Sequence, residues 1–452
     1  MLSGAAARAA LDAFATLLDE RWSYRRANNA DFPAAIAALR KRIAPGLSSD
    51  DLGIALQTIL ALGIDGHSGV SGYRLPPGGC LPFLVEPAGD RFVAVTPDRA
   101  RFLADGFPFL TRIDGQEMAA WCAAAGVLVP KGSPQYVRVR CLRLLRQIDY
   151  WRGRLDLPRK TTVEVELADP GGRALKVVTL PVAPAPLNYG VWPSGGSRLL
   201  EKDIGYLRLT SLQKEPSLAE IQEWMPKFRD TAGLIVDVRD NNGGDRDALM
   251  ALYSYLAAPD DPPHVFNAAA YRLHASHPAD YLALNHRMYR DGAREWTPPE
   301  RRAVAEFARA FRPRWELPKG QFSDWHYMAL SRIEDPGRYH YDRPVFVLSN
   351  GRSFSATDIF LAGLKGMKHV LLLGTPSSGG SAYSEEFPLG ATPLRLRIGS
   401  MASFQADGRL FDGQGIQPDV LLEPVPEFYI GGRDNVLEEA VRRIRAAGRR
   451  AS

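Results

Sequence analysis

The sequence has little cysteine and no long apolar run. Its 452 residues contain three cysteines, Cys80, Cys122 and Cys141. Their odd number argues against a complete disulfide framework, and their spacing matches no metal-binding motif. No segment reaches the ~20 consecutive apolar residues that cross a bilayer as a helix. We therefore expect no integral membrane segment. The first residues also lack a basic region followed by an apolar core, so no signal peptide is visible.

The sequence also lacks a tract of one charge. The net charge is +5, but the arginines are spread along the chain. Short clusters at 300–302 and 442–445 are typical of solvated helix faces, which argues against a nucleic-acid partner. Apolar residues make up 45% and charged residues 24%, the composition of an ordinary globular protein, and the length predicts several domains.

No pattern of metal ligands is present either. His274 and His277 stand three residues apart, but no neighbouring carboxylate pattern completes a site. We therefore predict neither a metal nor another cofactor.

The chain divides into three regions by its patterning. Residues 1–70 contain helical apolar stripes and end in a glycine-rich loop. Residues 71–186 contain short strand candidates and possible helices at 116–125 and 137–150, which predicts an antiparallel α+β module. From 187 to 452, buried strands alternate with helices, as in a layered α/β domain. A polar, aromatic and Pro-rich stretch at about 258–342, with one helix near 298–311, is interpreted as an insertion covering the functional site.

One stretch of the third region places a serine where chemistry is favoured. Residues 345–348 predict a buried strand, Asn350-Gly351 is a turn dipeptide, and helical spacing resumes after Ser355. A hydroxyl at a helix N-terminus lies near unpaired N–H groups and the positive end of the helix dipole. The alternative is structural, because a serine followed three residues later by Asp358 resembles a capping box.

Three further motifs stand out in other parts of the chain. Asp65-Gly-His67 follows a predicted helix, and an aimed histidine there could be a base or an ordinary turn residue. A buried strand runs into Asp237-x-Arg239-x-Asn-x-Gly-Gly244, whose acid and arginine we interpret as an ion pair or caps bracing the loop. Gly415-Ile-x-Pro-Asp419 lies near the end of the domain.

These four motifs, in this order, resemble the serine peptidases related to the C-terminal processing proteases and the tricorn core. The resemblance spans about residues 48–424. It implies an N-terminal helical segment (1–70), a PDZ-like module (71–186) and a catalytic domain of ClpP/crotonase-like fold (187–452). It also implies a peptide or protein substrate and suggests a periplasmic or secreted location.

The resemblance assigns roles to individual residues. Ser355 matches the nucleophile. The processing-protease branch uses a lysine just after the segment that is 374–379 here, but this position is Gly380, so a lysine mechanism is not expected. The tricorn branch uses a histidine from the helical segment, which corresponds to His67, and an acid that corresponds best to Asp412. Asp65 is the rival acid.

Backbone groups complete the implied site. The N–H groups of Gly243 and Ala356 match the family's oxyanion hole, and Gly244, Gly379 and Gly380 match positions that line the substrate. In the PDZ-like module, the loop 78–83 is the candidate for holding a C-terminal carboxylate on its amides.

The resemblance leaves a second function open. Retinoid-binding relatives use the same fold without catalysis, so a ligand- or peptide-binding protein is the alternative to a peptidase. The two differ in geometry. A peptidase needs the hydroxyl of Ser355 within hydrogen-bond reach of His67, whereas a binding protein would have a long apolar cavity with these residues far apart.

Overall fold

The computed structural model describes residues 1–44, 46–277, 281, 287–335 and 337–451. The helices are α1 (Gly4–Glu20), α2 (Phe32–Arg42), α3 (Ser49–Leu60), α4 (Met118–Gly126), α5 (Pro134–Leu144), α6 (Ile148–Arg154), α7 (Lys214–Trp224), η1 (Met225–Phe228), α8 (Asp247–Leu256), α10 (Pro298–Ala310), α11 (Ala356–Leu364), η2 (Pro426–Ile430) and α12 (Asn435–Ala451). The strands are β1 (Gly69–Ser71), β2 (Leu84–Ala88), β3 (Arg91–Val95), β4 (Phe109–Ile113), β5 (Gln116–Glu117), β6 (Thr162–Ala168), β7 (Leu175–Pro181), β8 (Arg198–Leu200), β9 (Ile204–Arg208), β10 (Gly233–Asp237), β11 (His264–Tyr271), β12 (His326–Leu330), β13 (Val345–Ser349), β14 (Val370–Gly374), β15 (Ser384–Pro388), β16 (Arg395–Gly399), β17 (Met401–Gln405) and β18 (Val420–Leu421).

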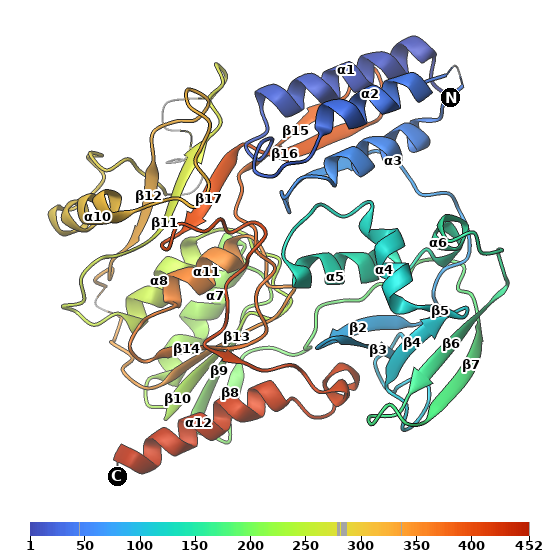
Figure 1. Ribbon diagram of the computed structural model, residues 1–452. Coiled ribbons are helices and arrows are strands. Elements are labelled where there is room, and N and C mark those ends of the chain that lie inside the picture. The colour runs from blue at the N-terminus through green and yellow to red at the C-terminus, as the bar shows by residue number, and fades with distance from the viewer. Residues whose placement is uncertain (45, 278–280, 282–286, 336, 452) are drawn as a thin grey trace.

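A six-stranded sheet of order β18-β14-β13-β10-β9-β8 forms the centre of the molecule, and only its β8–β9 pair is antiparallel (Figure 1). The register pairs Asp237 with Leu348 and Ser349 with Gly374, so three parallel strands end at one edge. The segments that follow these strands carry two of the four predicted motifs and the segment 374–379. Such an edge is the usual ligand-binding position of parallel α/β sheets.

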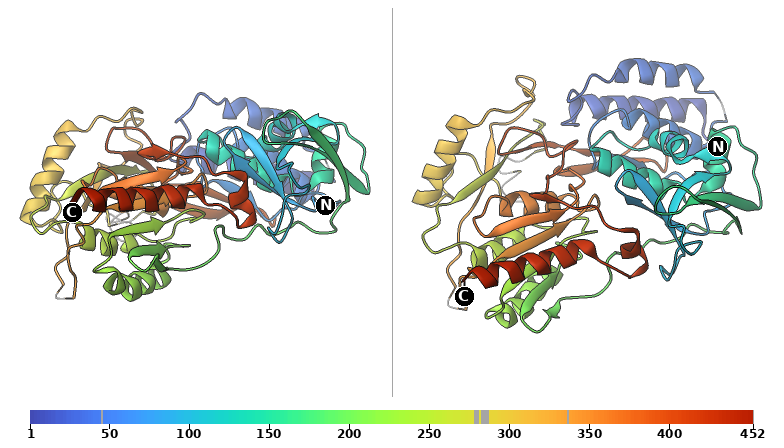
Figure 2. Two further views of the ribbon diagram at one scale, coloured as in Figure 1. Left: turned by 90° about the horizontal axis from the view of Figure 1, so that it is seen from below. Right: turned by 60° about the horizontal axis from the view of Figure 1, so that its bottom comes forward.

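Helices cover both faces of this sheet. On one face, α7, α8 and α11 share an apolar core with the strands, and on the other α12 packs through Val436, Ala440 and Ile444 (Figure 2). The strands are buried on both faces, which explains their continuous apolar runs in the sequence.

The region 71–186 contains the predicted antiparallel sheet, of order β2-β3-β4-β6-β7, with α4, α5 and α6 packed on it. The single helix expected at 137–150 is two helices, α5 and α6. The break lies at Arg146, whose carbonyl accepts a hydrogen bond from the N–H of Leu81.

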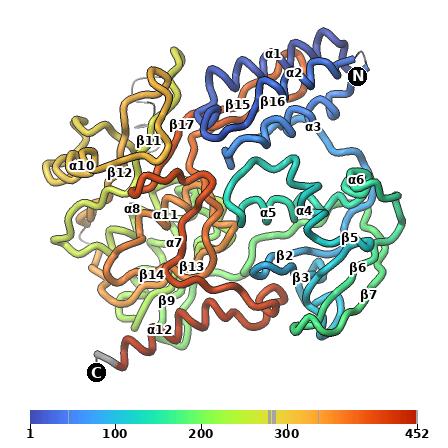
Figure 3. Tube along the Cα trace, in the orientation of Figure 1, coloured from blue at the N-terminus to red at the C-terminus, as the bar shows by residue number. Residues whose placement is uncertain are grey.

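The N-terminal helices do not stand alone. They pack on a three-stranded sheet, β1-β16-β15, in which β1 near the start of the chain pairs with β16 near its end (Figure 3). The residues of α1–α3 share one core with Leu389, Leu394, Leu396 and Ile398. The loop that carries His67 is therefore anchored to the C-terminal part of the chain.

The stretch 258–342 contains more structure than the one predicted helix. Its strands β11 and β12 form an antiparallel sheet with β17, and α10 packs against them. Among the described residues, no helix is long and apolar enough to span a bilayer.

Candidate active site

Ser355 lies at the turn between β13 and α11 in a strained backbone conformation. Its φ of 63° and ψ of −122° are sparsely populated for a residue with a side chain. Ser355 is the N-cap residue of α11, yet its hydroxyl makes no capping hydrogen bond. Instead, its Oγ lies 2.9 Å from Nε2 of His67. The capping box that the sequence allowed is not formed.

Hydrogen bonds from neighbouring segments hold this turn. The hydroxyl of Ser353 donates to the carbonyl of Val238 (2.8 Å), and the N–H of Phe354 donates to the carbonyl of Asn241 (2.9 Å). Phe354 also packs into the apolar core of the region 71–186, against Tyr136. The strained serine is thus fixed by its own sheet and by the neighbouring region.

His67 follows α3 in a buried loop and stacks on Phe354, with ring centroids 4.5 Å apart. Its backbone N–H donates to Oδ1 of Asp65 (2.9 Å). Burial lowers the pKa of His67 to about 3, and the charges of Arg397 and Arg140 act in the same direction. The imidazole is therefore neutral at pH 7. Its Nδ1 is buried and has no hydrogen-bond partner among the described residues.

The two candidate acids, Asp65 and Asp412, lie near the imidazole of His67, but neither forms a hydrogen bond with its Nδ1. Asp412 accepts hydrogen bonds from the hydroxyl of Tyr24 (2.7 Å) and from the N–H groups of Ser381 (3.0 Å) and Gly66 (3.2 Å). Burial and the charge of Asp65 raise the pKa of Asp412 to about 7. The geometry therefore does not single out one acid.

Asp65 is braced as tightly as Asp412. Its Oδ2 accepts hydrogen bonds from the indole N–H of Trp22 and from the N–H of Gly399, both 2.8 Å long. Burial raises its pKa too. Trp22 lies just beyond α1 and Gly399 ends β16, so both ends of the chain position this carboxylate.

The same three residues are a candidate metal-binding group in the described part of the chain. Ligand atoms of Asp65, His67 and Asp412 lie within 4.8 Å of one another. However, all four carboxylate oxygens already accept hydrogen bonds from N–H or O–H donors. Such donors point hydrogen atoms at the oxygens that would face a cation, so the residues do not fit a metal site.

The two backbone N–H donors predicted for an oxyanion hole differ in whether they already make a hydrogen bond. The N–H of Ala356, at the start of α11, makes no hydrogen bond to any described residue. The N–H of Gly243 donates to Oδ1 of Asn241 (2.9 Å). Gly243 has a φ of 96°, and a Cβ there would lie 2.8 Å from the nitrogen of Ala356, so only glycine fits beside the turn.

The missing lysine has a steric explanation. A Cβ on Gly380 would lie 2.3 Å from the ring of Phe354 and 3.2 Å from Cε1 of His67. The imidazole and the phenyl ring therefore occupy the space that a side chain at this position would need. Gly379 donates its N–H to Oδ1 of Asp358 (3.0 Å). Neither glycine lines the cavity beside Ser355, whereas Gly244 does.

A cavity of about 1000 Å³ opens beside Ser355. Its walls come from the His67 loop, from α5 and the residues after it, and from the loop that contains Gly243 and Gly244. None of the described residues in 258–342 lines it, so the interpretation of that stretch as a cover for the site stays a prediction. The stretch extends the β17 side of the molecule.

The loop 78–83 offers fewer free amides than an anion site requires. The N–H of Gly79 donates to Oδ2 of Asp149 (2.7 Å). Those of Cys80 and Leu81 donate to the carbonyls of Ala183 and Arg146, each 2.8 Å away.

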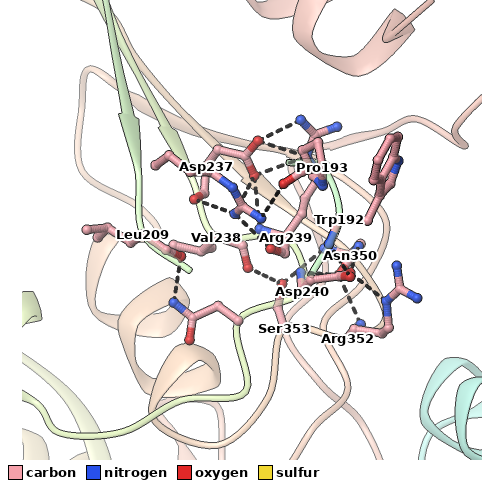
Figure 4. A network of polar contacts seen from close by, with 12 residues as sticks. Trp192, Pro193, Leu209, Asp237, Val238, Arg239, Asp240, Asn350, Arg352 and Ser353 are labelled. Carbon is pink, nitrogen blue, oxygen red and sulfur yellow. Dashed lines mark hydrogen bonds and ion pairs between the residues drawn. The ribbon is translucent and has the colours of Figure 1, made fainter. Parts of the chain in front are cut away.

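Figure 4 shows the polar contacts around Asp237 and Arg239. Asp237 accepts a hydrogen bond from the guanidinium of Arg239 at 2.6 Å. In addition, Asp237 accepts from the hydroxyl of Tyr206 at 2.7 Å, and the guanidinium of Arg239 reaches Asp434 at 2.8 Å. The pair links the end of β10 to the start of α12, which agrees with the structural role predicted for it. Next to it, Asp240 accepts from the side chains of Asn350 and Arg352 in the serine turn.

Sequence reasoning missed several residues around the site. Tyr24 holds Asp412 and Tyr136 donates its hydroxyl to the carbonyl of Gly66 (3.1 Å), yet neither lies in a motif. Arg352 reaches Glu86 of β2 at 2.8 Å across the two regions. A buried glutamate in a strand is a weak sequence signal, and its partner is 266 residues away.

The comparisons with known proteins confirm the family resemblance. Residues 203–422 match the family model of peptidase family S41. The chain is also 33% identical over 112 residues to a carboxy-terminal-processing protease of Bartonella bacilliformis. That alignment covers 25% of this chain and 25% of the relative.

Solved structures share the overall fold. The structure of mature CPAF complexed with lactacystin aligns with a TM-score of 0.66 and 17% identity over 98% of both chains. A putative peptidase from Parabacteroides merdae aligns with a TM-score of 0.51 and 17% identity, over 98% of this chain and 97% of its own. The mixed α/β architecture described above is therefore one that peptidase structures also have.

Proposed function

We propose that this protein is a serine peptidase that hydrolyses peptide bonds of peptides or proteins through an acyl-enzyme at Ser355. The observation that carries the proposal is the 2.9 Å contact between Oγ of Ser355 and Nε2 of His67, at a strained turn that lines a cavity. A serine needs such a base to attack a carbonyl carbon. The family match over residues 203–422 supports the same reaction.

In this mechanism, neutral His67 takes the hydroxyl proton as Ser355 attacks the peptide carbonyl. The imidazolium then gives the proton to the leaving amine, and an acyl-enzyme remains. Water, deprotonated by the same imidazole, hydrolyses that ester and frees the serine. Asp65 and Asp412 would stabilise the imidazolium through their charge, and Asp412 is our first choice because the family pattern places an acid there.

The oxyanion of the tetrahedral intermediate would accept the free N–H of Ala356. The N–H of Gly243 would be the second donor once it exchanges Oδ1 of Asn241 for the substrate oxygen. Two aimed donors of this kind contribute several kcal/mol to the transition state, about 3 kcal/mol for each. By the same proposal, Gly244 contacts the substrate from the cavity wall, while Gly379 and Gly380 act by leaving room for His67 and Phe354.

The domain names follow the proposal: 71–186 would be the PDZ-like module and 187–452 the ClpP/crotonase-like catalytic domain. No observation favours the binding-protein alternative. It called for a long apolar cavity with Ser355 and His67 far apart, whereas these residues are in contact and arginines line their cavity.

The test is hydrolysis of a mixed library of fluorogenic peptides by purified protein. We expect turnover by the wild type and loss of turnover in Ser355→Ala. Ser194→Ala is the control, because this exposed serine lies outside the cavity beside Ser355. Equal turnover by Ser355→Ala and the wild type would refute the proposal.

A further inference from the structure

The cavity beside Ser355 is lined by an excess of positive charge. Among the described residues, four arginines face it: Arg140, Arg143, Arg146 and Arg397. Glu386 is the one acid in the same lining, and Arg395 already pairs with it. None of the four arginines has a carboxylate within ion-pair distance in the described part of the chain.

Three of these arginines follow one another along α5 and its C-terminal turn. Arg140 and Arg143 are three positions apart, and Arg146 is three positions further. Like charges three positions apart are neighbours on a helix surface and destabilise the helix slightly. The charges of Glu86 and Asp240 reach Arg143, but no carboxylate in the described part of the chain lies within ion-pair distance of the three side chains. The arrangement is therefore better explained by a ligand than by the stability of the helix.

Arg140 lies near the residue that precedes the serine. Its guanidinium lies 5.7 Å from the ring of Phe354, the residue that precedes Ser355, and 5.3 Å from that of Tyr136. The side chain is exposed and free of ion pairs among the described residues. It can therefore reach a substrate carboxylate without breaking an ion pair.

Arg143 and Arg146 are held more firmly. Arg143 stacks 3.4 Å above the ring of Tyr189, and its buried Nη1 has no hydrogen-bond partner. Arg146 donates to the carbonyls of Arg143 (2.8 Å) and Leu187 (3.0 Å). Both guanidinium groups are thus oriented in advance, and both also line a second cavity of about 330 Å³ beside the first.

Positive charge also comes from another element. Arg397 of β16 lines the cavity, with its Nε fixed 2.7 Å from Oγ of Ser384. Its charge reaches His67, whose pKa it helps to lower. A substrate held against Ser355 therefore meets guanidinium groups from two separate elements.

We infer that this cavity selects peptide segments that carry acidic side chains next to the bond presented to Ser355. The inference rests on the proposed peptidase function and specifies its substrate class. Guanidinium groups bind carboxylates through paired hydrogen bonds. A free C-terminal carboxylate would bind by the same hydrogen bonds, but it supplies only one carboxylate. Four guanidinium groups from two elements match a segment with several carboxylates better.

Peptide binding to the Ser355→Ala variant tests this inference without requiring catalysis. Three fluorescein-labelled dodecapeptides are compared by fluorescence polarisation at low salt: alternating Glu and Ala with both ends capped, alternating Gln and Ala with both ends capped, and the Gln peptide with a free C-terminal carboxylate. We expect the Glu peptide to bind at least about tenfold more tightly than the capped Gln peptide, with the contrast shrinking as salt rises. The free-carboxylate peptide should bind less tightly than the Glu peptide.

Arginine variants in the same background locate the effect. Arg140→Gln should reduce the Glu-to-Gln contrast by about fivefold, because it removes one exposed charge from the cavity wall. Arg143→Lys keeps the charge and should retain most of the contrast. Arg159→Gln is the matched control, since this exposed arginine lies outside the cavity lining and its loss changes the net charge equally.

The inference is overturned if the Glu and capped Gln peptides bind equally, if the free-carboxylate peptide binds as tightly as the Glu peptide, or if Arg159→Gln reduces the contrast as much as Arg140→Gln. Labelling of wild-type Ser355 by a fluorophosphonate is measured in parallel. Labelling without a binding contrast would refute the acidic selectivity alone. A binding contrast without labelling would refute the peptidase proposal.

Discussion

Two buried aspartates, Asp237 and Asp412, have pKa values that are shifted in opposite directions from the ordinary value. Burial alone would raise the pKa of Asp237, but the charges of Arg239 and Arg208 outweigh it and lower this pKa to about 2. Asp412 is buried equally, yet no arginine or lysine in the described part of the chain pairs with it. Burial and the charge of Asp65 raise its pKa to about 7.

The difference separates a cluster that stabilises the fold from the cluster that we propose for catalysis. Around Asp237, every charge has a partner, and the network joins β10 to α12. Around Asp412, hydrogen bonds hold two carboxylates close together while the nearby Nδ1 of His67 has no partner. Perturbed, incompletely paired groups of this kind cluster at functional sites. The first cluster therefore stabilises the fold, and the second is the one that we propose for catalysis.

Replacement of His67 should give the largest effect. His67→Ala removes the proposed base and is expected to lower kcat/KM for peptide hydrolysis by about 10²–10⁴-fold, with little change in the urea midpoint. His340→Ala, at an exposed histidine, is the control and should behave as the wild type. A His67→Ala enzyme with more than half of the wild-type activity would assign the base to another residue.

Replacement of Arg239 should destabilise the cluster around Asp237. Arg239→Ala leaves Asp237 and Asp434 without their shared cation, which is expected to lower the free energy of unfolding by ~3–5 kcal/mol. Urea denaturation followed by circular dichroism measures this loss. The exposed pair of Lys227 and Glu223 provides the control, since Lys227→Ala should cost less than ~1 kcal/mol. Similar losses in both variants would show that burial of the network contributes nothing.

Neutral replacements of the two acids should affect the rate moderately. Asp65→Asn and Asp412→Asn each remove a carboxylate beside the imidazole. We therefore expect kcat to fall by about tenfold or more, with a small change in KM. The variant with the larger loss identifies the acid that stabilises the imidazolium. Unchanged kcat in both would remove the carboxylates from the mechanism.

The smallest effect is on the pH dependence of stability. The pKa of Asp412 is raised on folding, so the folded state holds a proton between pH 4 and 7 that the unfolded state has lost. Its contribution to stability is fully present below about pH 4 and is lost as the pH rises toward 7. Asp412→Asn lacks this contribution, so its unfolding free energy relative to wild type should rise over that range, by at most about 1.4 kcal/mol per pH unit. A difference that is flat or falls would contradict the raised pKa.

Sequence patterns predicted the elements whose burial leaves a clear signature. The strands at 345–349 and 233–237 are buried on both faces and appear in the sequence as continuous apolar runs. The strands β11, β12 and β15 were missed, because polar and aromatic side chains interrupt their patterns. The break between α5 and α6 depends on a hydrogen bond to Leu81, which no local pattern encodes.

The residues of the candidate site also fall into those with a local sequence signal and those without one. Ser355 and His67 were found because glycine-rich turns and helix boundaries mark them, and the structure brings them together from 288 positions apart. The positions of Asp65, Tyr24 and the α5 arginines depend on how distant segments pack. The pairing of β1 with β16, which anchors the His67 loop, joins residues more than 300 positions apart and leaves no periodic signal in either strand.

The most direct test of the central claim is mass-spectrometric mapping of the residue modified by a fluorophosphonate probe. The account predicts a single adduct on Ser355 in the wild type, no adduct in Ser355→Ala, and strongly slowed labelling in His67→Ala. An adduct on another serine, or equal labelling of Ser355→Ala, would contradict it.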